Sequence, residues 1–274
     1  MIIETSPEQT RGVPGTAHGA GRRVASLARA EALLLRRDPL ALLTAIGTPI
    51  AVMLFLGTTL PPGSADGTGA VGMVVGFVAF TLLTGVYHNL TATLVARREA
   101  LVLKRLRTGE LSDTEILAGA AVPAVTLAWG QVAVAATAVA VLVGLDWPHN
   151  PILTVLGLTL GTAVFVLLAM VTTIITRSVA MAQITTTPML LASMLLSGLL
   201  PGDLPETLQR LADLLPLTAV VQLLRMGLTG TTTGTQLNVA GTLTTAMVPL
   251  LILLAWTAAA AWVARRWFRW EPRR

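Results

Sequence analysis

The amino-acid sequence predicts an all-α membrane protein with six transmembrane helices and with both termini in the cytoplasm. Hydrophobic residues make up 54% of the chain and charged residues only 12%, whereas a soluble domain carries about 25% charged residues. Several apolar blocks are long enough to cross a bilayer, because a hydrocarbon core about 30 Å thick needs roughly 20 helical residues. The blocks do not alternate apolar and polar residues, so helices are favoured over a β-barrel.

The N-terminal segment precedes the apolar blocks. Residues 1–21 are polar, contain glycine and proline, and include no apolar stretch of a signal peptide, so we expect a disordered cytoplasmic tail. In residues 22–38, Arg22, Arg29 and Arg36 share one face of a helix, and leucine and valine side chains occupy the other. This pattern predicts an amphipathic helix that lies on the membrane surface with its arginines towards anionic headgroups.

Residues 39–264 form the predicted transmembrane domain. Its expected spans are, in order, residues 40–60, 69–95, 116–143, 151–176, 179–199 and 237–264. Ser112 and Glu115 have the spacing of a capping box, which predicts the start of the third span. In the second span, Tyr87, His88 and Asn89 either face other helices and the interface or line a pathway.

Residues 201–228 are too polar to span a membrane and too apolar to form a loop. Pro205 opens one short helix, and Pro216 separates it from a second. Two short helices broken by proline predict a re-entrant hairpin, whose ends must be buried by protein. After the sixth span, residues 265–274 form a basic cytoplasmic tail, anchored at the interface by Trp262 and Trp267.

The distribution of charged residues predicts the orientation of the chain in the membrane and indicates a contact with a soluble protein. With the N-terminus inside, every lysine and arginine except Arg210 and Arg225 falls on the cytoplasmic side, as the positive-inside rule requires. The hairpin is then extracytoplasmic. The run of mixed charge at residues 97–115 is cytoplasmic, and mixed charge suits a polar groove on a protein better than lipid headgroups.

Several kinds of chemistry are absent from the sequence. No glycine-rich phosphate loop precedes Lys104, so the chain cannot hydrolyse ATP by that route. His18, His88 and His149 are scattered and predict neither a metal site nor a catalytic triad. No acid lies in the middle of a span, which disfavours proton- or sodium-coupled transport. The net charge of +5 is explained by the cytoplasmic loops, and nucleic acid is not an expected partner.

Three sequence elements together are typical of one family. They are Arg36-Arg37-Asp38-Pro39, Arg97-Arg98-Glu99 with Leu103-Lys104-Arg105-Leu106-Arg107, and Leu196-Ser197-Gly198-Leu199-Leu200-Pro201 with Leu214-Leu215-Pro216-Leu217-Thr218 and Arg225. With them, the chain resembles an ABC-2 type transporter permease of the drug and antibiotic exporter branch found in actinobacteria. The likeness extends from about Arg22 to the C-terminus.

The resemblance implies a half-transporter in the bacterial cytoplasmic membrane. Two permeases, identical or different, would pair among membrane lipids, and each would receive a separate ATPase subunit that binds ATP and magnesium. Residues 97–107 would be the coupling helix. The residues expected to contact the ATPase are Arg98, Glu99, Lys104, Arg105 and Arg107. The alternative is a solvated loop that merely follows the positive-inside rule.

The resemblance also implies a pathway between two permease copies, lined by the second and fifth spans. The expected lining residues are Thr84, His88, Gln183, Met189, Ser193 and Met194; each could equally serve helix packing. The hairpin would close the outer mouth as a gate formed by Pro201, Pro205, Pro216 and Arg225.

These expectations describe the non-enzymatic permease subunit of an ATP-driven exporter of a hydrophobic or amphipathic compound, with a role in antibiotic resistance. Two alternatives stay open. One is an ABC-2 permease for a lipid-linked glycan, and the other is a membrane enzyme or sensor that has no ATPase partner.

Overall fold

The computed structural model describes Gly47, Ala51 and residues 67–103, 112–199, 205–231 and 239–268. The predicted N-terminal tail, the interfacial helix and nearly all of the first span lie outside these residues. So do Lys104, Arg105, Arg107 and Pro201, and the last six residues of the basic tail. The predictions for these parts of the chain stay predictions.

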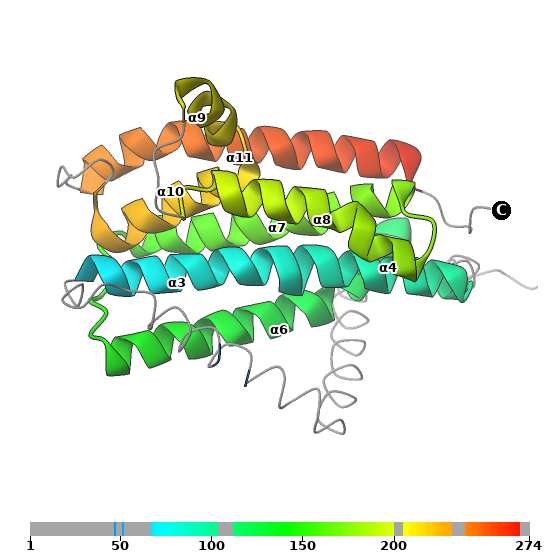
Figure 1. Ribbon diagram of the computed structural model, residues 1–274, viewed down its shortest axis with the longest axis horizontal. Helices are drawn as coiled ribbons and strands as arrows, with labels where there is room; N and C mark the ends of the chain where they lie inside the picture. Colours follow the sequence, from blue (N-terminus) through cyan, green and yellow to red (C-terminus); the bar gives the residue numbers. More distant parts are fainter. Residues whose placement is uncertain are drawn as a thin grey trace, which may run out of the picture.

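The described residues are organised as long helices that run along one axis of the molecule (Figure 1). The second predicted span is one continuous helix made of α3 (Gly67–Thr81), η1 (Leu82–His88) and α4 (Asn89–Glu99). The others are α6 (Asp113–Leu142), α7 (Pro151–Ile175), α8 (Val179–Leu196) and α11 (Val239–Trp267). In the described ranges, 5 helices are long and apolar enough to cross a membrane, which confirms a helical, multi-pass architecture.

The helix starts follow the signals in the sequence. At α6, the amide of Glu115 donates to Ser112 Oγ over 3.3 Å, and the amide of Ser112 donates to Glu115 Oε2 over 2.8 Å, so the predicted capping box is confirmed. At α7, Asn150 Oδ1 accepts from the amide of Leu153 over 3.2 Å. Asn150 also ties α7 to α11, because its side-chain amide donates to Thr242 Oγ1 over 3.2 Å.

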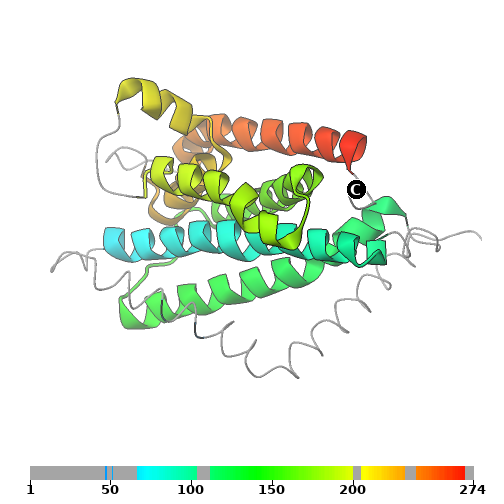
Figure 2. The same ribbon diagram turned by 45° about the vertical axis from the view of Figure 1, so that its right-hand side comes forward.

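The segment before the last span forms two short helices, α9 (Glu206–Asp213) and α10 (Pro216–Thr229), which meet at 82°. Such a bend fits either a broken span or a re-entrant hairpin. Pro216 occupies the first turn of α10, where its fixed backbone angle and missing N–H are tolerated. Views of the molecule from two directions show α9 standing out from the bundle (Figures 1 and 2).

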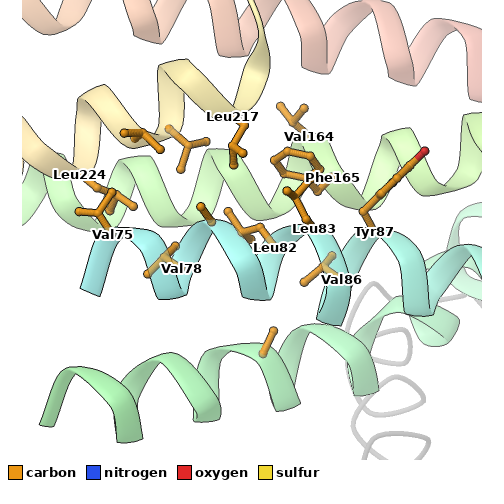
Figure 3. Packing of buried hydrophobic residues seen from close by; sticks show 14 of the residues in the cluster. Val75, Val78, Leu82, Leu83, Val86, Tyr87, Val164, Phe165, Leu217 and Leu224 are labelled. Atoms are coloured by element: carbon orange, nitrogen blue, oxygen red, sulfur yellow. The ribbon is translucent and has the colours of Figure 1, made fainter. Parts of the chain in front are cut away.

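The core forms around α10, which packs against α7, α11 and α3. Leu217, Leu223 and Leu224 of α10 are buried against α3 and α7. Figure 3 shows Leu217 and Leu224 facing Val75 and Val78 on α3, Leu82 on η1, and Phe165 on α7. The short helix is thus an internal element of the bundle.

Glycines let α7 and α10 approach each other closely. A Cβ atom added at Gly161 would lie 2.7 Å from Val220 Cγ2, and one at Gly157 would lie 3.1 Å from Leu223 Cβ. Small residues at such contacts favour close helix packing inside membranes, where dispersion contacts largely replace the hydrophobic drive. Gly161 is therefore required for the close contact between α7 and α10.

Candidate functional site

The second span contains a π-helical stretch, Leu82–His88. π-Helices are rare and are frequent at functional sites. Inside it, Thr84 Oγ1 donates to the carbonyl of Phe80 over 2.8 Å. The wider turn changes the directions in which the side chains at its C-terminal end, Tyr87 and His88, leave the helix axis.

Tyr87 and His88 join the second span to two other spans. Tyr87 is buried and its hydroxyl lies 3.0 Å from Thr172 Oγ1 on α7. Its ring packs edge-on against Phe165, with 6.3 Å between the ring centroids. His88 Nδ1 lies 2.7 Å from Thr186 Oγ1 on α8. Tyr87 and His88 were predicted either to face other helices and the interface or to line a pathway. The structure shows that both side chains contact other helices.

A pocket of about 270 Å³ lies along one face of the same span. Its lining combines aromatic and hydrogen-bonding side chains: Phe77, Phe80, Thr81, Thr84, Gly85, His88, Asn89, Ala92 and Gln131. Binding pockets are commonly apolar with a few placed polar groups. Thr84 and His88, predicted as pathway residues, therefore lie in one pocket.

Three residues of this lining, Gln131, Phe77 and Phe80, were not predicted as site residues. Gln131 is a long polar side chain near the middle of an apolar helix, and such residues in membrane spans are commonly functional. That signal was available in the sequence. The two phenylalanines gave no such signal, because aromatic residues inside a span are ordinary.

The pathway residues predicted on α8 do not converge on this pocket. Gln183 is exposed. Met189 and Met194 are half-buried and pack against the core. Ser193 is fully buried, and its hydroxyl has no hydrogen-bond partner among the residues that the structure describes. Met189 and Ser193 share a face of α8, because they are four residues apart, but none of the four residues lines the pocket.

The last turn of α4 carries the described part of the predicted coupling segment. Arg98 is fully buried, and its Nη1 donates to the carbonyl of Thr173 over 2.8 Å. Its Nη2 donates to the carbonyl of Thr176. These carbonyls lie at the C-terminal end of α7, where helix carbonyls lack helical partners and a positive charge is favourable.

Arg98 was predicted to contact the ATPase, and the structure shows its side chain buried within the chain. Since the side chain is 0% exposed, it offers no contact surface to another protein in this structure. Glu99 is exposed and Arg97 is half-exposed, so these two residues carry the accessible charges in the described part of the segment, next to the exposed Ala100, Leu101 and Val102. Arg98 instead attaches the end of the second span to the end of the fourth.

The chain makes a turn directly after α4. Leu101 has a φ angle of 57°, a left-handed conformation that is unfavourable for residues other than glycine. Its amide donates to the carbonyl of Arg98 over 3.1 Å. The exit from the second span is thus fixed by a strained turn.

The described gate residues lie around α9 and α10. Pro205 precedes α9 and is exposed, whereas Pro216 is buried. Arg225 of α10 donates from Nη2 to the carbonyl of Gly198, just beyond α8, over 3.0 Å. Arg225 therefore ties the core helix to the end of the fifth span. Among the described residues, no group of three His, Cys, Asp or Glu could hold a metal ion.

The class of protein follows from these features. Several long apolar helices, a bent helix pair and a charged segment at one end of the bundle define a multi-pass helical membrane protein. The family model for ABC-2 type transporters matches residues 22–229. The chain belongs to the ABC-2 type transporter family and is the membrane component of an ABC transporter. No curated protein matches the sequence in a direct comparison.

Proposed function

We propose that the chain is the permease subunit of an ATP-driven exporter that moves a hydrophobic or amphipathic compound out of the cell. A separate ATPase subunit would bind ATP and magnesium, and the chain itself would not hydrolyse ATP. Two permease copies, identical or different, would pair in the bacterial cytoplasmic membrane. An antibiotic or another drug is a substrate of the expected chemistry.

One observation carries this proposal. The continuous helix Gly69–Glu99 carries both a pocket inside the span and a charged, exposed end. The pocket lining places phenylalanine rings beside hydroxyl, imidazole and amide groups, which suits an amphipathic compound. Because Arg98 joins the end of this helix to α7, a force on the exposed segment would also reach α7 and the core helix α10.

A lipid-linked glycan is the second candidate within the family. Its polar chain would require a long groove with several aromatic platforms. The pocket of about 270 Å³ is below the usual range of about 300–1,000 Å³ for drug-sized ligands, and this size favours a compact compound. The presence of an ATPase partner distinguishes both transport functions from the alternative of an enzyme or sensor, which would have none.

Co-purification tests the proposal. The tagged full-length chain is expressed in its native membrane, extracted in mild detergent and analysed for bound subunits. We expect an ATPase with a phosphate loop to be retained, and ATP hydrolysis by the complex to rise when a transported hydrophobic compound is added. Recovery of the folded chain with no ATPase would refute the exporter function and favour the enzyme or sensor.

A variant in the pocket tests the proposed pathway separately. Gln131→Leu removes the amide that α6 contributes to the lining, while the ATPase contact lies at the end of the bundle. We expect a higher substrate concentration for half-maximal stimulation of ATP hydrolysis, with unchanged hydrolysis in the absence of substrate. The control is Thr126→Val, an exposed position on the same helix outside the pocket.

A further inference from the structure

His88 is held by α8 through one of its two ring nitrogens. Its Nδ1 lies 2.7 Å from Thr186 Oγ1. Thr186 is 0% exposed, so water does not compete for its hydroxyl group. The neutral imidazole ring has one nitrogen that donates and one that accepts. The position of the hydrogen in this contact therefore decides whether the other nitrogen, Nε2, is a donor or an acceptor.

The hydroxyl hydrogen of Thr186 is already used within α8. Thr186 Oγ1 donates to the carbonyl of Ala182, about one turn earlier, over 2.8 Å. A hydroxyl group has a single hydrogen but two lone pairs. If that hydrogen pointed at His88 instead, two oxygens 2.8 Å apart would face each other with no hydrogen between them. Thr186 therefore accepts in the contact with His88, and His88 Nδ1 is the donor.

This assignment leaves Nε2 of the neutral His88 ring as an acceptor. Nε2 forms no hydrogen bond with a residue in the described ranges. The His88 side chain is half-buried and lines the pocket of about 270 Å³. Since Nδ1 is occupied by α8, Nε2 is the ring nitrogen that remains for a molecule in the pocket.

Thr84 adds a second acceptor to the same pocket. It precedes His88 by four residues, about one turn, and lines the pocket with it. Its hydroxyl hydrogen is donated to the carbonyl of Phe80 over 2.8 Å, so the lone pairs of Thr84 Oγ1 remain for a ligand. The two lining groups whose hydrogens are placed by the structure thus both favour a ligand that donates.

The pocket also favours an uncharged ligand. Its described lining contains no Asp, Glu, Lys or Arg side chain, and burying an ion without a partner is costly. An aliphatic amine is charged at neutral pH. A hydroxyl group stays neutral and donates one hydrogen, while its lone pairs suit the side-chain amides of Asn89 and Gln131 in the lining. Phe77 and Phe80 offer apolar surface to the rest of such a compound.

We propose that Thr186 is a positioning residue that fixes the hydrogen of His88 on Nδ1, and that the pocket thereby selects a neutral, mostly apolar compound with a hydroxyl group. The hydroxyl group of the compound donates to His88 Nε2. This inference rests on the proposed function, because the pocket belongs to the proposed transport pathway. It narrows the hydrophobic or amphipathic substrate to one that bears a hydroxyl group.

Nuclear magnetic resonance of the full-length chain in detergent tests the position of the hydrogen. The chain is labelled with ¹⁵N in its histidine rings, and His88→Gln identifies the His88 signals by their loss. We expect a hydrogen on Nδ1 and none on Nε2 in the wild type. Thr186→Val removes the acceptor and should change these signals, whereas Thr187→Val, at an exposed threonine on the same helix, should not. A hydrogen on Nε2 in the wild type would overturn the proposal.

A matched pair of ligands tests the selection. 2-Naphthol carries a hydroxyl group, and 2-methoxynaphthalene keeps the oxygen but cannot donate. Binding of the tritiated compounds to the full-length chain in maltoside detergent is measured by equilibrium dialysis against protein-free micelles. We expect 2-naphthol to bind about two- to tenfold more tightly, as one neutral hydrogen bond allows. Thr186→Val should remove this preference, whereas Thr186→Ser, which keeps the hydroxyl group, and Thr187→Val should retain it.

The outcomes separate this inference from the proposed function. Equal binding of both compounds, tighter binding of the ether or binding of neither would overturn the selection, even if the chain retains an ATPase. A preference for 2-naphthol in a chain that retains no ATPase would refute the exporter function and leave the hydroxyl-selective pocket standing. If Thr186→Val does not fold, as judged by circular dichroism, the hydrogen position and the ligand preference of the wild type still decide.

Discussion

Arg98 shows how a single residue can serve a role opposite to the one its sequence position suggests. Two consecutive arginines at the end of an apolar span are normally read as cytoplasmic surface charge. The neighbouring residue Glu99 is indeed exposed, but Arg98 is completely buried. Its guanidinium donates to the carbonyls of Thr173 and Thr176, which would otherwise end α7 without partners.

Replacement of Arg98 tests this internal role. Arg98→Gln removes the charge and shortens the side chain, so the carbonyls of Thr173 and Thr176 lose their donors inside the protein. We expect a loss of about 1–3 kcal/mol of stability, measured as a lower midpoint of thermal unfolding in detergent. Glu99→Gln is the control and should change stability by less than about 0.5 kcal/mol. Equal effects of the two variants would contradict the internal role.

Leu101 provides a second test at the scale of a residue. Its φ angle of 57° costs an L-residue about 1–2 kcal/mol, and glycine adopts this conformation without strain. Leu101→Gly should therefore raise the unfolding midpoint. Val102→Gly, one residue later inside a helical turn, should lower the midpoint, because it costs about 0.5–1 kcal/mol of stability. A lower midpoint in Leu101→Gly would show that the turn is not strained.

At the scale of elements, hydropathy predicted most of the helices correctly. The predicted second span, residues 69–95, is found within the helix Gly69–Glu99, and the predicted fourth span, 151–176, corresponds to Pro151–Ile175. Length and apolar character suffice for such a prediction, because a spanning segment must satisfy its own backbone hydrogen bonds. The predicted ends of the spans differ from the observed helix ends by a few residues, because the length of an apolar stretch says little about where the last helical turn stops.

The π-helical stretch and the central position of α10 could not be predicted from the sequence. Leu82–His88 has the composition of an ordinary apolar helix, so no residue in it signals the wider turn. Pro216 correctly separated two short helices. The sequence did not show whether α10, the second of these helices, lies at the edge or at the centre of the bundle. Its central position follows from the contact with α7.

The contact between α7 and α10 makes a prediction about packing. Gly161→Ala places a methyl group 2.7 Å from Val220 Cγ2, so we expect a loss of about 1–3 kcal/mol through overpacking. Gly130→Ala on α6, where no atom lies within 4 Å of the new methyl group, should be neutral or slightly stabilising. Thermal unfolding in detergent measures both variants.

A double-mutant cycle assigns the effect to the pair. Val220→Ala removes the two methyl groups nearest to the new Cβ of Gly161→Ala and leaves Leu82 Cδ1 at 3.3 Å. The double variant should therefore lose less stability than the sum of the two single variants, with a coupling of at least about 0.5 kcal/mol. Strict additivity would show that α10 moves away from α7 instead of packing tightly against it.

At the scale of the whole molecule, the second span connects an internal pocket with a charged end. The pocket lies beside the π-helical stretch, and the charged end is attached to α7 through Arg98. α7 in turn packs against α10, which packs against α11 and α3. This chain of contacts gives a physical route by which a partner bound at the end of the bundle could move the walls of the pocket.

Residues 97–107 were predicted from the sequence as the surface that receives the partner. Only Arg97, Arg98, Glu99 and the residues up to Leu103 lie in the described part of the chain. A charge pattern can indicate a contact surface, but it cannot tell an inward side chain from an outward one. The contact role of Glu99 and Arg105 therefore stays a prediction, and exchanging their charges tests it.

Substrate-stimulated ATP hydrolysis by the chain reconstituted with its ATPase tests the central claim most directly. The compared proteins are the wild type and the double variant Glu99→Arg with Arg105→Glu, and Arg266→Glu serves as an exposed control at the end of α11. The account predicts that the double variant inserts normally into the membrane but loses stimulation by substrate, while the control keeps it. Unchanged stimulation in the double variant would contradict the claim that this segment couples ATP hydrolysis to transport.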